Sequence, residues 1–139
     1  MKLRIYTDGG ARGNPGPAAV GVVVCDGRDK VIFEHNDCIG NATNNIAEYC
    51  ALIAGLEIAK RLKAKEVECF MDSELLANQL SGNYKIKADH IRTLYDHAKK
   101  TAAFFKSVTY HHRRRETPML RHADRLVNDA LDHEQRDGL

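Results

Sequence analysis

The stretch NIAEYCALIAGLEIAKRLK, residues 45–63, decides the fold. From Ile46 to Ala59 only Glu48 and Glu57 are charged, so the predicted helix is apolar almost all round. Such a helix lies buried in the middle of a domain rather than on its surface. We therefore expect the rest of the chain to pack around this helix.

Short runs rich in β-forming residues lie on both sides of the helix. Asp26 and Gly27 predict a hairpin turn between two of the runs, and Thr117-Pro118 is typical of the start of a helix. The predicted strands are 3–7, 20–25, 30–38, 67–71 and 107–111, and the further helices are a short one ending at Leu80, 89–105 and 117–136. This order, β-β-β-α-β-α-α-β-α, predicts an α/β fold in which helices flank a mixed sheet.

Length and composition indicate one globular domain over residues 1–139. The chain is 43% apolar and 29% charged, which is ordinary for a folded protein. Neither a membrane-spanning run nor a secretory leader is evident, so we expect a cytoplasmic protein. Residues 84–139 carry a net charge of +4, including Arg113, Arg114 and Arg115, whereas residues 1–83 carry a net charge of −2. This asymmetry suits a polyanionic partner, and a merely solvated surface is the open alternative.

The four cysteines predict neither a metal site nor a disulfide. Cys25, Cys38, Cys50 and Cys69 are widely spaced, without a C-x-x-C pair. If residues 26–29 form a tight turn, Cys25 faces residue 30 or 31, and Cys38 lies on the order of 23 Å along the ladder. We expect four reduced, buried cysteines in a reducing compartment.

Two aspartates each follow a predicted strand. Asp8 precedes Gly9, and Asp72 precedes Ser73. Ligands bind at the carboxyl ends of strands in open α/β sheets, so both are candidate site residues. Aspartate is also a common turn residue, and for either residue alone this alternative stays open.

Glu48 and Asp124 are acids on predicted apolar faces. Nine helical steps place Glu48 opposite Glu57, which shares its side with Lys60 and Arg61 and so marks the solvent face. Glu48 then points inward, where a carboxylate needs a proton, a hydrogen bond or a cation. The alternative is a capping box with Asn45.

Asp124 shows the same pattern on the last helix. It begins an apolar series with Val127 and Leu131, which favours an inward-facing position over a solvated one. If the four acids converge, Mg²⁺ or Mn²⁺ would relieve their mutual repulsion. Two such ions form a site that cleaves phosphodiesters.

Taken together, these motifs resemble type 1 ribonuclease H, in the short form without a basic protrusion or a hybrid-binding domain. The matching segments are TDGGARGNPG (7–16), TNNIAE (43–48), DS (72–73) and ADRLVNDAL (123–131). The combination is specific, although each part alone is weak. The resemblance implies a five-stranded mixed sheet with helices on both faces and, in a monomer, cleavage of the RNA strand of RNA–DNA hybrids to leave 3′-hydroxyl and 5′-phosphate ends.

The resemblance also assigns the site residues. The catalytic, metal-binding acids are Asp8, Glu48, Asp72 and Asp124, and the substrate contacts are Gly10, Ala11, Arg12, Asn14, Thr43 and Asn44. The contacts from 10–14 and from Asn44 would lie in the minor groove, where 2′-hydroxyls mark RNA. Thr43 would contact a phosphate of the DNA strand. Roles in the turn and in capping the helix are the alternatives for Asn14, Thr43 and Asn44.

Three departures from the family pattern concern the grip on substrate and the auxiliary histidine. The 81–89 connection lacks the basic, tryptophan-bearing handle, for which Lys85, Lys87 and the run 113–115 are the suspected substitutes. Glu74 stands where some members carry glutamine. The auxiliary histidine is assigned to His112, with His111 and His122 as alternatives, and with the further alternative that none of them has this role.

Two other functions compete with this interpretation. A catalytically silent domain could bind hybrid or double-stranded RNA, but it has no physical reason to keep four mutually repelling acids. Integrases, transposases or resolvases share the fold and act on DNA, but they lack the GNPG and TNN segments that this chain has at 13–16 and 43–45.

Overall fold

A five-stranded mixed sheet organises the chain. The computed structural model describes residues 1–83 and 85–137. The strands are β1 (Lys2–Ala11), β2 (Gly16–Cys25), β3 (Val31–Ala42), β4 (Glu66–Met71) and β5 (Ser107–His112), in the order β3-β2-β1-β4-β5. The β1–β2 and β2–β3 pairs are antiparallel, and β4 is parallel to both β1 and β5. The predicted mixed sheet is confirmed.

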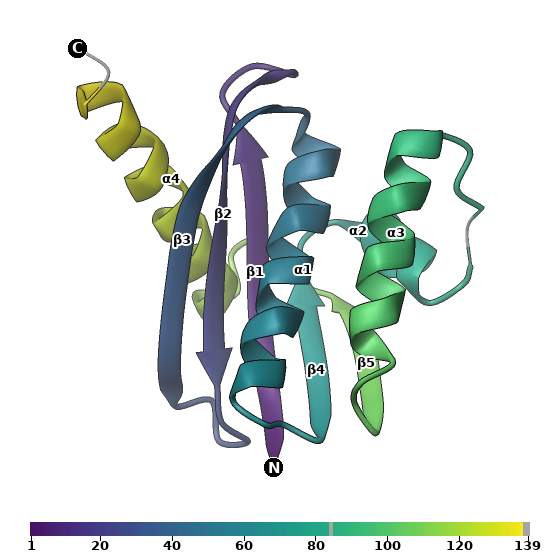
Figure 1. The fold of residues 1–139 in the computed structure, drawn as a ribbon. Helices are drawn as coiled ribbons and strands as arrows, with labels where there is room; N and C mark the ends of the chain where they lie inside the picture. The colour runs from purple at the N-terminus through teal and green to yellow at the C-terminus, as the bar shows by residue number, and fades with distance from the viewer. Residues whose placement is uncertain (84, 138–139) are drawn as a thin grey trace.

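Helices cover both faces of this sheet, as the sequence predicts. Figure 1 shows α1 (Asn44–Arg61) and α3 (Asp89–Ala102) in front of the sheet and α4 (Pro118–Asp137) behind it, and the short α2 (Glu74–Leu80) follows β4. Pro118 begins α4, where its missing N–H removes no helical hydrogen bond. Among the described helices none is long and apolar enough to cross a membrane.

The alternation of side chains along β1 divides the core into two layers. Leu3 and Ile5 are fully buried in the cluster that includes α1, α2 and α3. Tyr6 points to the other face and packs with Phe70 and with Leu120 of α4. This period of two is what a strand buried on both sides requires.

The first strand is longer than its apolar run indicates. The sequence ends it at residue 7, but β1 continues to Ala11 because Asp8 and the three residues after it pair with β2. Pairing with β4 stops earlier, at Tyr6 opposite Phe70. Asp8 therefore lies inside β1 but beyond the last β1–β4 pair. It pairs with β2 on one side and has no partner in β4 on the other.

The cysteine predictions are partly confirmed. All four thiols are free, and Cys25 pairs with Val31, as the predicted hairpin requires. Cys25 and Cys69 are buried, whereas Cys38 and Cys50 are only half-buried. The expectation that all four are buried is wrong, because Cys38 lies on the edge strand β3, which has a neighbouring strand on one side only.

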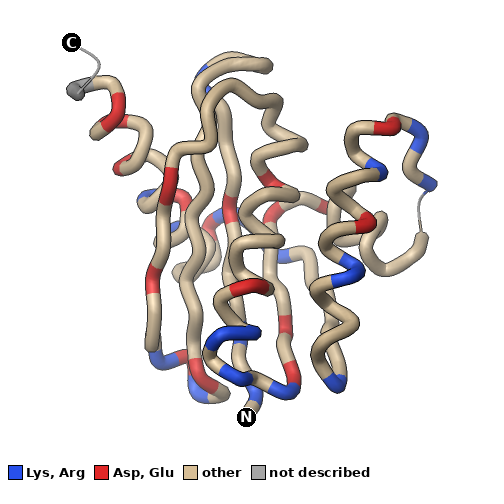
Figure 2. Tube along the Cα trace, in the orientation of Figure 1, with Lys and Arg blue, Asp and Glu red and all other residues tan. Residues whose placement is uncertain are grey.

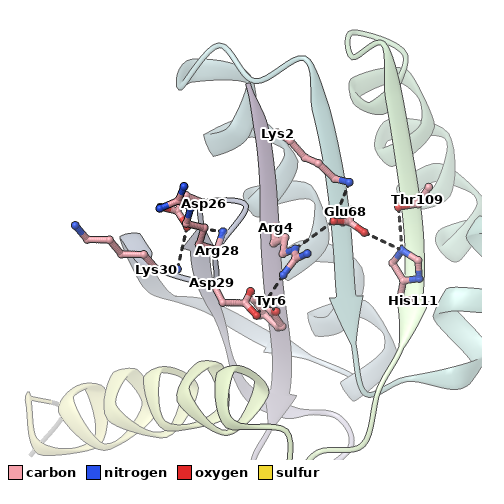
Figure 3. A network of polar contacts seen from close by, with 10 residues as sticks. All are labelled: Lys2, Arg4, Tyr6, Asp26, Arg28, Asp29, Lys30, Glu68, Thr109 and His111. Carbon is pink, nitrogen blue, oxygen red and sulfur yellow. Dashed lines mark hydrogen bonds and ion pairs between the residues drawn. The ribbon is translucent and has the colours of Figure 1, made fainter.

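A polar network covers the face of β1, β4 and β5 that α4 leaves open. Figure 3 shows Glu68 of β4 between Arg4 and His111, with Lys2 above it. The Arg4 Nε and Lys2 Nζ atoms lie 3.2 and 3.3 Å from the Glu68 carboxylate. The network gives these polar side chains partners on an exposed sheet face.

Two glycines allow the helix backbones to touch the sheet. A Cβ atom at Gly9 of β1 would overlap the carbonyl oxygen of Ala47 in α1, and one at Gly21 of β2 would overlap that of Ala123 in α4. These contacts set how closely α1 and α4 approach the sheet.

We predict that Gly21→Ala destabilises the protein by about 3 kcal/mol or more, because α4 must move away from β2. Urea denaturation measures this loss. The matched control is Gly27→Ala in the β2–β3 turn, where a Cβ would have no atom within 4 Å. The control should change the free energy of unfolding by less than about 0.5 kcal/mol. Equal losses in the two variants would contradict the close approach of α4.

Candidate active site

Four acidic residues from four segments meet at one end of the sheet. Asp8 lies in β1, Glu48 in α1, Asp72 directly after β4 and Asp124 in α4. Asp8, Glu48 and Asp124 line one pocket of about 300 Å³. A larger hollow of about 590 Å³ between β3 and α4 contains none of the four acids.

Asp8 has the most strained electrostatic environment of the four. Asp8 is only 8% exposed to solvent. Burial, the charge of Asp72 and the contact with Asp124 together raise the pKa of Asp8 to about 8, and Arg115 opposes this shift. Three of the predicted acids therefore interact directly. An ionised Asp8 is costly unless positive charge is placed beside it.

Glu48 faces the same site and does not cap its helix. Burial raises its pKa to about 7, although a hydrogen bond from Ser73 acts in the opposite direction. The cap of α1 is Thr43, whose hydroxyl accepts from the N–H of Ile46 at 3.2 Å. The capping-box alternative for Glu48 is therefore wrong, because the helix begins two residues earlier than a box with Asn45 requires.

Glu57 does not lie on an open solvent face. Its carboxylate accepts a hydrogen bond from Thr101 of α3 at 3.2 Å, and His97 lies 4.0 Å away. The helical spacing placed Glu57 correctly on the side opposite Glu48. It could not show that α3 packs there, since that contact joins segments 44 residues apart.

Arg115 is the site residue that sequence reasoning assigned to another role. It lies between β5 and α4, and its Nε donates to Asp72 Oδ2 at 3.0 Å. Its charge also lowers the pKa of Asp8 and Glu48. The sequence suggested only that the run 113–115 grips substrate. The sequence signal for this role was the position of Arg115, nine residues before Asp124, in the loop that leads from β5 into α4.

The three candidate histidines lie outside the group of four acids. His112 ends β5 opposite Met71, next to the segment of Asp72, and no contact joins it to the four acids among the described residues. His111 stacks on Phe70 with 5.0 Å between ring centroids. His122 lies 3.3 Å from Glu34 of β3, which is a surface ion pair when the histidine is protonated.

The donor set at this site suits a hard divalent cation. It consists of carboxylate oxygens, which Mg²⁺ and Mn²⁺ prefer. The raised pKa values of Asp8 and Glu48 show that their ionised forms are unfavourable, and a nearby cation would stabilise those forms. Within residues 1–83 and 85–137, no three His, Cys, Asp or Glu side chains already converge on one point. Binding a cation therefore requires these side chains to turn toward one point.

The predicted substrate-contact segments are joined to each other. Asn14 Oδ1 of the β1–β2 loop accepts from the N–H of Asn44 at 3.0 Å, and Asn44 Oδ1 accepts from the N–H of Ala11 at 2.9 Å. Gly10, Ala11, Arg12 and Asn44 also line the pocket of the acids. With both oxygens engaged, the exposed side-chain NH₂ groups of Asn14 and Asn44 remain as donors on this surface.

Arg12 turns its side chain toward α4. Its guanidinium lies 2.6 Å from Asp132 Oδ1, 2.7 Å from Gln135 Oε1 and 3.3 Å from Asn128 Oδ1. Its guanidinium is therefore bound within the fold rather than free for a ligand. The side chain instead ties the β1–β2 loop to the C-terminal half of α4.

The suspected substitutes for the basic handle occupy different places. Lys85 and Lys87 are exposed in the connection between α2 and α3, and Figure 2 shows basic positions there. Arg113 lies over the Phe70 ring, 5.3 Å from its centroid. Glu74 is the exposed first residue of α2.

Known proteins match this chain along nearly its whole length. A family profile described as reverse transcriptase-like matches residues 6–130. A bifunctional protein of Mycobacterium tuberculosis is 46% identical over 95% of this chain, which spans only 36% of that protein's length. Ribonuclease HI of Halobacterium salinarum is 40% identical over 94% of this chain and 65% of its own length.

Solved structures agree with the sequence matches. The N-terminal ribonuclease H domain of the M. tuberculosis protein, solved as a fusion with maltose-binding protein, superposes with a TM-score of 0.93 at 42% identity, covering 100% of this chain and 99% of that chain. LC11 ribonuclease H1, solved in complex with an RNA/DNA hybrid, gives a TM-score of 0.90 at 40% identity, with 96% and 99% coverage.

We predict that Asp8→Asn stabilises the protein in chelator, and that the gain depends on pH. A buried carboxylate whose pKa is raised from 3.8 to about 8 lowers stability as pH rises through that interval. The gain should be near zero at pH 4 and reach at least about 1 kcal/mol at pH 8. Urea denaturation from pH 4 to 9 measures it.

The matched control is Asp37→Asn, which removes the same charge from an exposed position of β3. It should give no comparable gain at pH 8. A constant or falling difference between Asp8→Asn and the unmodified protein would show that Asp8 is not under electrostatic strain.

Proposed function

The chain belongs to the type 1 ribonuclease H family, and from this premise we propose that it is a metal-dependent endoribonuclease that hydrolyses the RNA strand of RNA–DNA hybrids. A member of 40% identity was solved with such a hybrid, which supports this choice of substrate. Because the chain spans about a third of the M. tuberculosis protein, the proposal concerns this domain.

The electrostatic effect of Asp72 and Asp124 on the buried Asp8 is the observation that carries the proposal. Folding brings together acids from β1, from the end of β4 and from α4, and raises the pKa of Asp8 at a cost in stability. A domain that only bound nucleic acid would repel phosphates with these charges. The cost is understandable if the acids hold cations for phosphodiester cleavage.

Asp8, Glu48, Asp72 and Asp124 are the residues that we propose to hold Mg²⁺, with Mn²⁺ as a substitute. Two bound ions supply activation of the attacking water and stabilisation of the leaving oxygen, which leaves 3′-hydroxyl and 5′-phosphate ends. The chain's contribution is to bring four carboxylates to one end of the sheet, from where their side chains can turn toward the ions.

The loop of β1–β2 and the start of α1 are proposed to recognise the RNA strand. The hydrogen bonds between Asn14, Asn44 and Ala11 fix both amide side chains with their NH₂ groups exposed. Those donors and the backbone of residues 10–12 can bind 2′-hydroxyls in the minor groove, which DNA lacks. Glu48 can accept from the 2′-hydroxyl beside the scissile phosphate. Thr43, at the exposed start of α1, is the proposed contact for a phosphate of the DNA strand.

We further propose that the domain works as a cytoplasmic monomer. All four acids and the proposed RNA contacts come from one chain, so the site needs no second copy. The four free thiols suit a reducing compartment. Lys85 and Lys87 stand in the connection that could meet the duplex beyond the site.

Cleavage of one end-labelled sequence as RNA–DNA, RNA–RNA and DNA–DNA duplexes tests the proposal. Each duplex is incubated with Mg²⁺, with Mn²⁺ and with chelator. We expect cutting of the RNA strand of the hybrid with either metal and none in chelator. Asp72→Asn should lower the cleavage rate by at least about 10²-fold. Binding of hybrid without cutting under every metal would instead support the silent binding domain.

We predict that Arg115→Ala lowers kcat by at least about tenfold, because Arg115 positions Asp72 and balances the charge of the acids. His112→Ala should change kcat by less than about threefold, since none of the described contacts joins His112 to the acids. Multiple-turnover cleavage of the hybrid at saturating substrate measures both kcat values. The opposite order would return the auxiliary role to His112.

A further inference from the structure

A second hollow lies beside the acids, on the far side of Asp124. It has a volume of about 400 Å³ and is lined by Arg115, Glu116, Arg121, Asp124 and Arg125. We call it the arginine pocket. Arg115 and Asp124 also line the pocket of the acids, which extends past Asp8 to Asn44. The two hollows therefore form one continuous surface across the proposed cleavage site.

Arg121 and Arg125 carry charge that the fold does not use. They lie one turn apart at the start of α4, and both are exposed. Within the described part of the chain, neither forms an ion pair, whereas Arg115 is bonded to Asp72. Two guanidinium groups with free donors thus stand next to a proposed catalytic carboxylate.

This placement is unfavourable for the helix itself. The first turn of α4 contains no acidic residue, although negative charge is what stabilises a helix N-terminus. Arg121 stands there instead, and Arg125 follows at the i+4 position, where like charges repel, although Asp124 at i+3 from Arg121 offsets part of this repulsion. An anionic ligand would reverse both effects. The charges therefore point to a bound anion rather than to helix stability.

We propose that the arginine pocket binds a phosphate of the RNA strand adjacent to the scissile phosphate. This rests on the proposed function, because it places the scissile phosphate at the four acids. The next phosphate of the same strand then enters the hollow that shares Arg115 and Asp124 with the site. Guanidinium groups suit phosphate oxygens because their N–H donors match them in pairs.

The first test compares Arg121→Gln/Arg125→Gln with the matched control Arg28→Gln, an exposed arginine of the β2–β3 turn. Binding of hybrid is measured by fluorescence anisotropy with Ca²⁺ in place of Mg²⁺, across a range of salt concentrations. We expect Kd to rise about 5- to 20-fold in the double variant, and the slope of log K against log salt to become shallower by about 1. Arg28→Gln should leave both unchanged.

The second test identifies the phosphate. Single linkages of either strand near the cut are replaced by uncharged methylphosphonate. One RNA-strand linkage next to the scissile one should weaken binding to the unmodified protein, and the same replacement should add little to the loss in the double variant. Coupling to a DNA-strand linkage, coupling to no linkage, or a Kd equal to that of Arg28→Gln would each overturn the proposal.

The outcomes separate this inference from the proposed function. If the unmodified protein binds hybrid without cutting it, the cleavage proposal fails, and the methylphosphonate comparison still decides whether Arg121 and Arg125 hold a phosphate. Folding is not in doubt for the double variant, since neither arginine has a partner to lose. Its melting temperature should equal or exceed that of the unmodified protein.

Discussion

The site depends on two close approaches between backbones. Gly9 directly follows Asp8 and lies against Ala47, which directly precedes Glu48. Gly21 pairs with Asp8 across the β1–β2 ladder and lies against Ala123, which directly precedes Asp124. Each contact is therefore one residue away from an acid that it brings to Asp8. A side chain at either glycine would separate a helix from the sheet and would separate the acids with it.

The electrostatic repulsion among the acids destabilises the same fold whose apolar packing brings them together. Buried apolar side chains on both faces of β1 stabilise the fold, and that same fold holds Asp8 where ionisation is unfavourable. Arg115 offsets part of this repulsion through its bond with Asp72. Sites of this kind trade stability for a local charge that only ligands fully balance. The order of strands alone does not produce the site, because Asp8 also needs β4 to end before it.

The sequence predicted those features that repeat with a period or stand at an element boundary. The helical spacing separated Glu48 from Glu57, and the apolar stripe placed Asp124 beside Val127 and Leu131, both of which are buried. Contacts between distant segments have no such signal. The bond of Arg115 to Asp72 joins residues 43 apart, and Arg12 reaches Gln135 across 123 residues. The exposure of Cys38 likewise depended on β3 being an edge strand.

The tie between Arg12 and α4 makes two distant parts of the molecule respond together. Figure 1 shows the C-terminal half of α4 extending past the sheet. Asp132 and Gln135 lie in this half and fasten it to the loop that carries Asn14. Thermal fraying of the last turns would therefore loosen the β1–β2 loop through the contacts of Arg12. The loop at residues 12–15 is thus held by the far end of the same helix that carries Asp124.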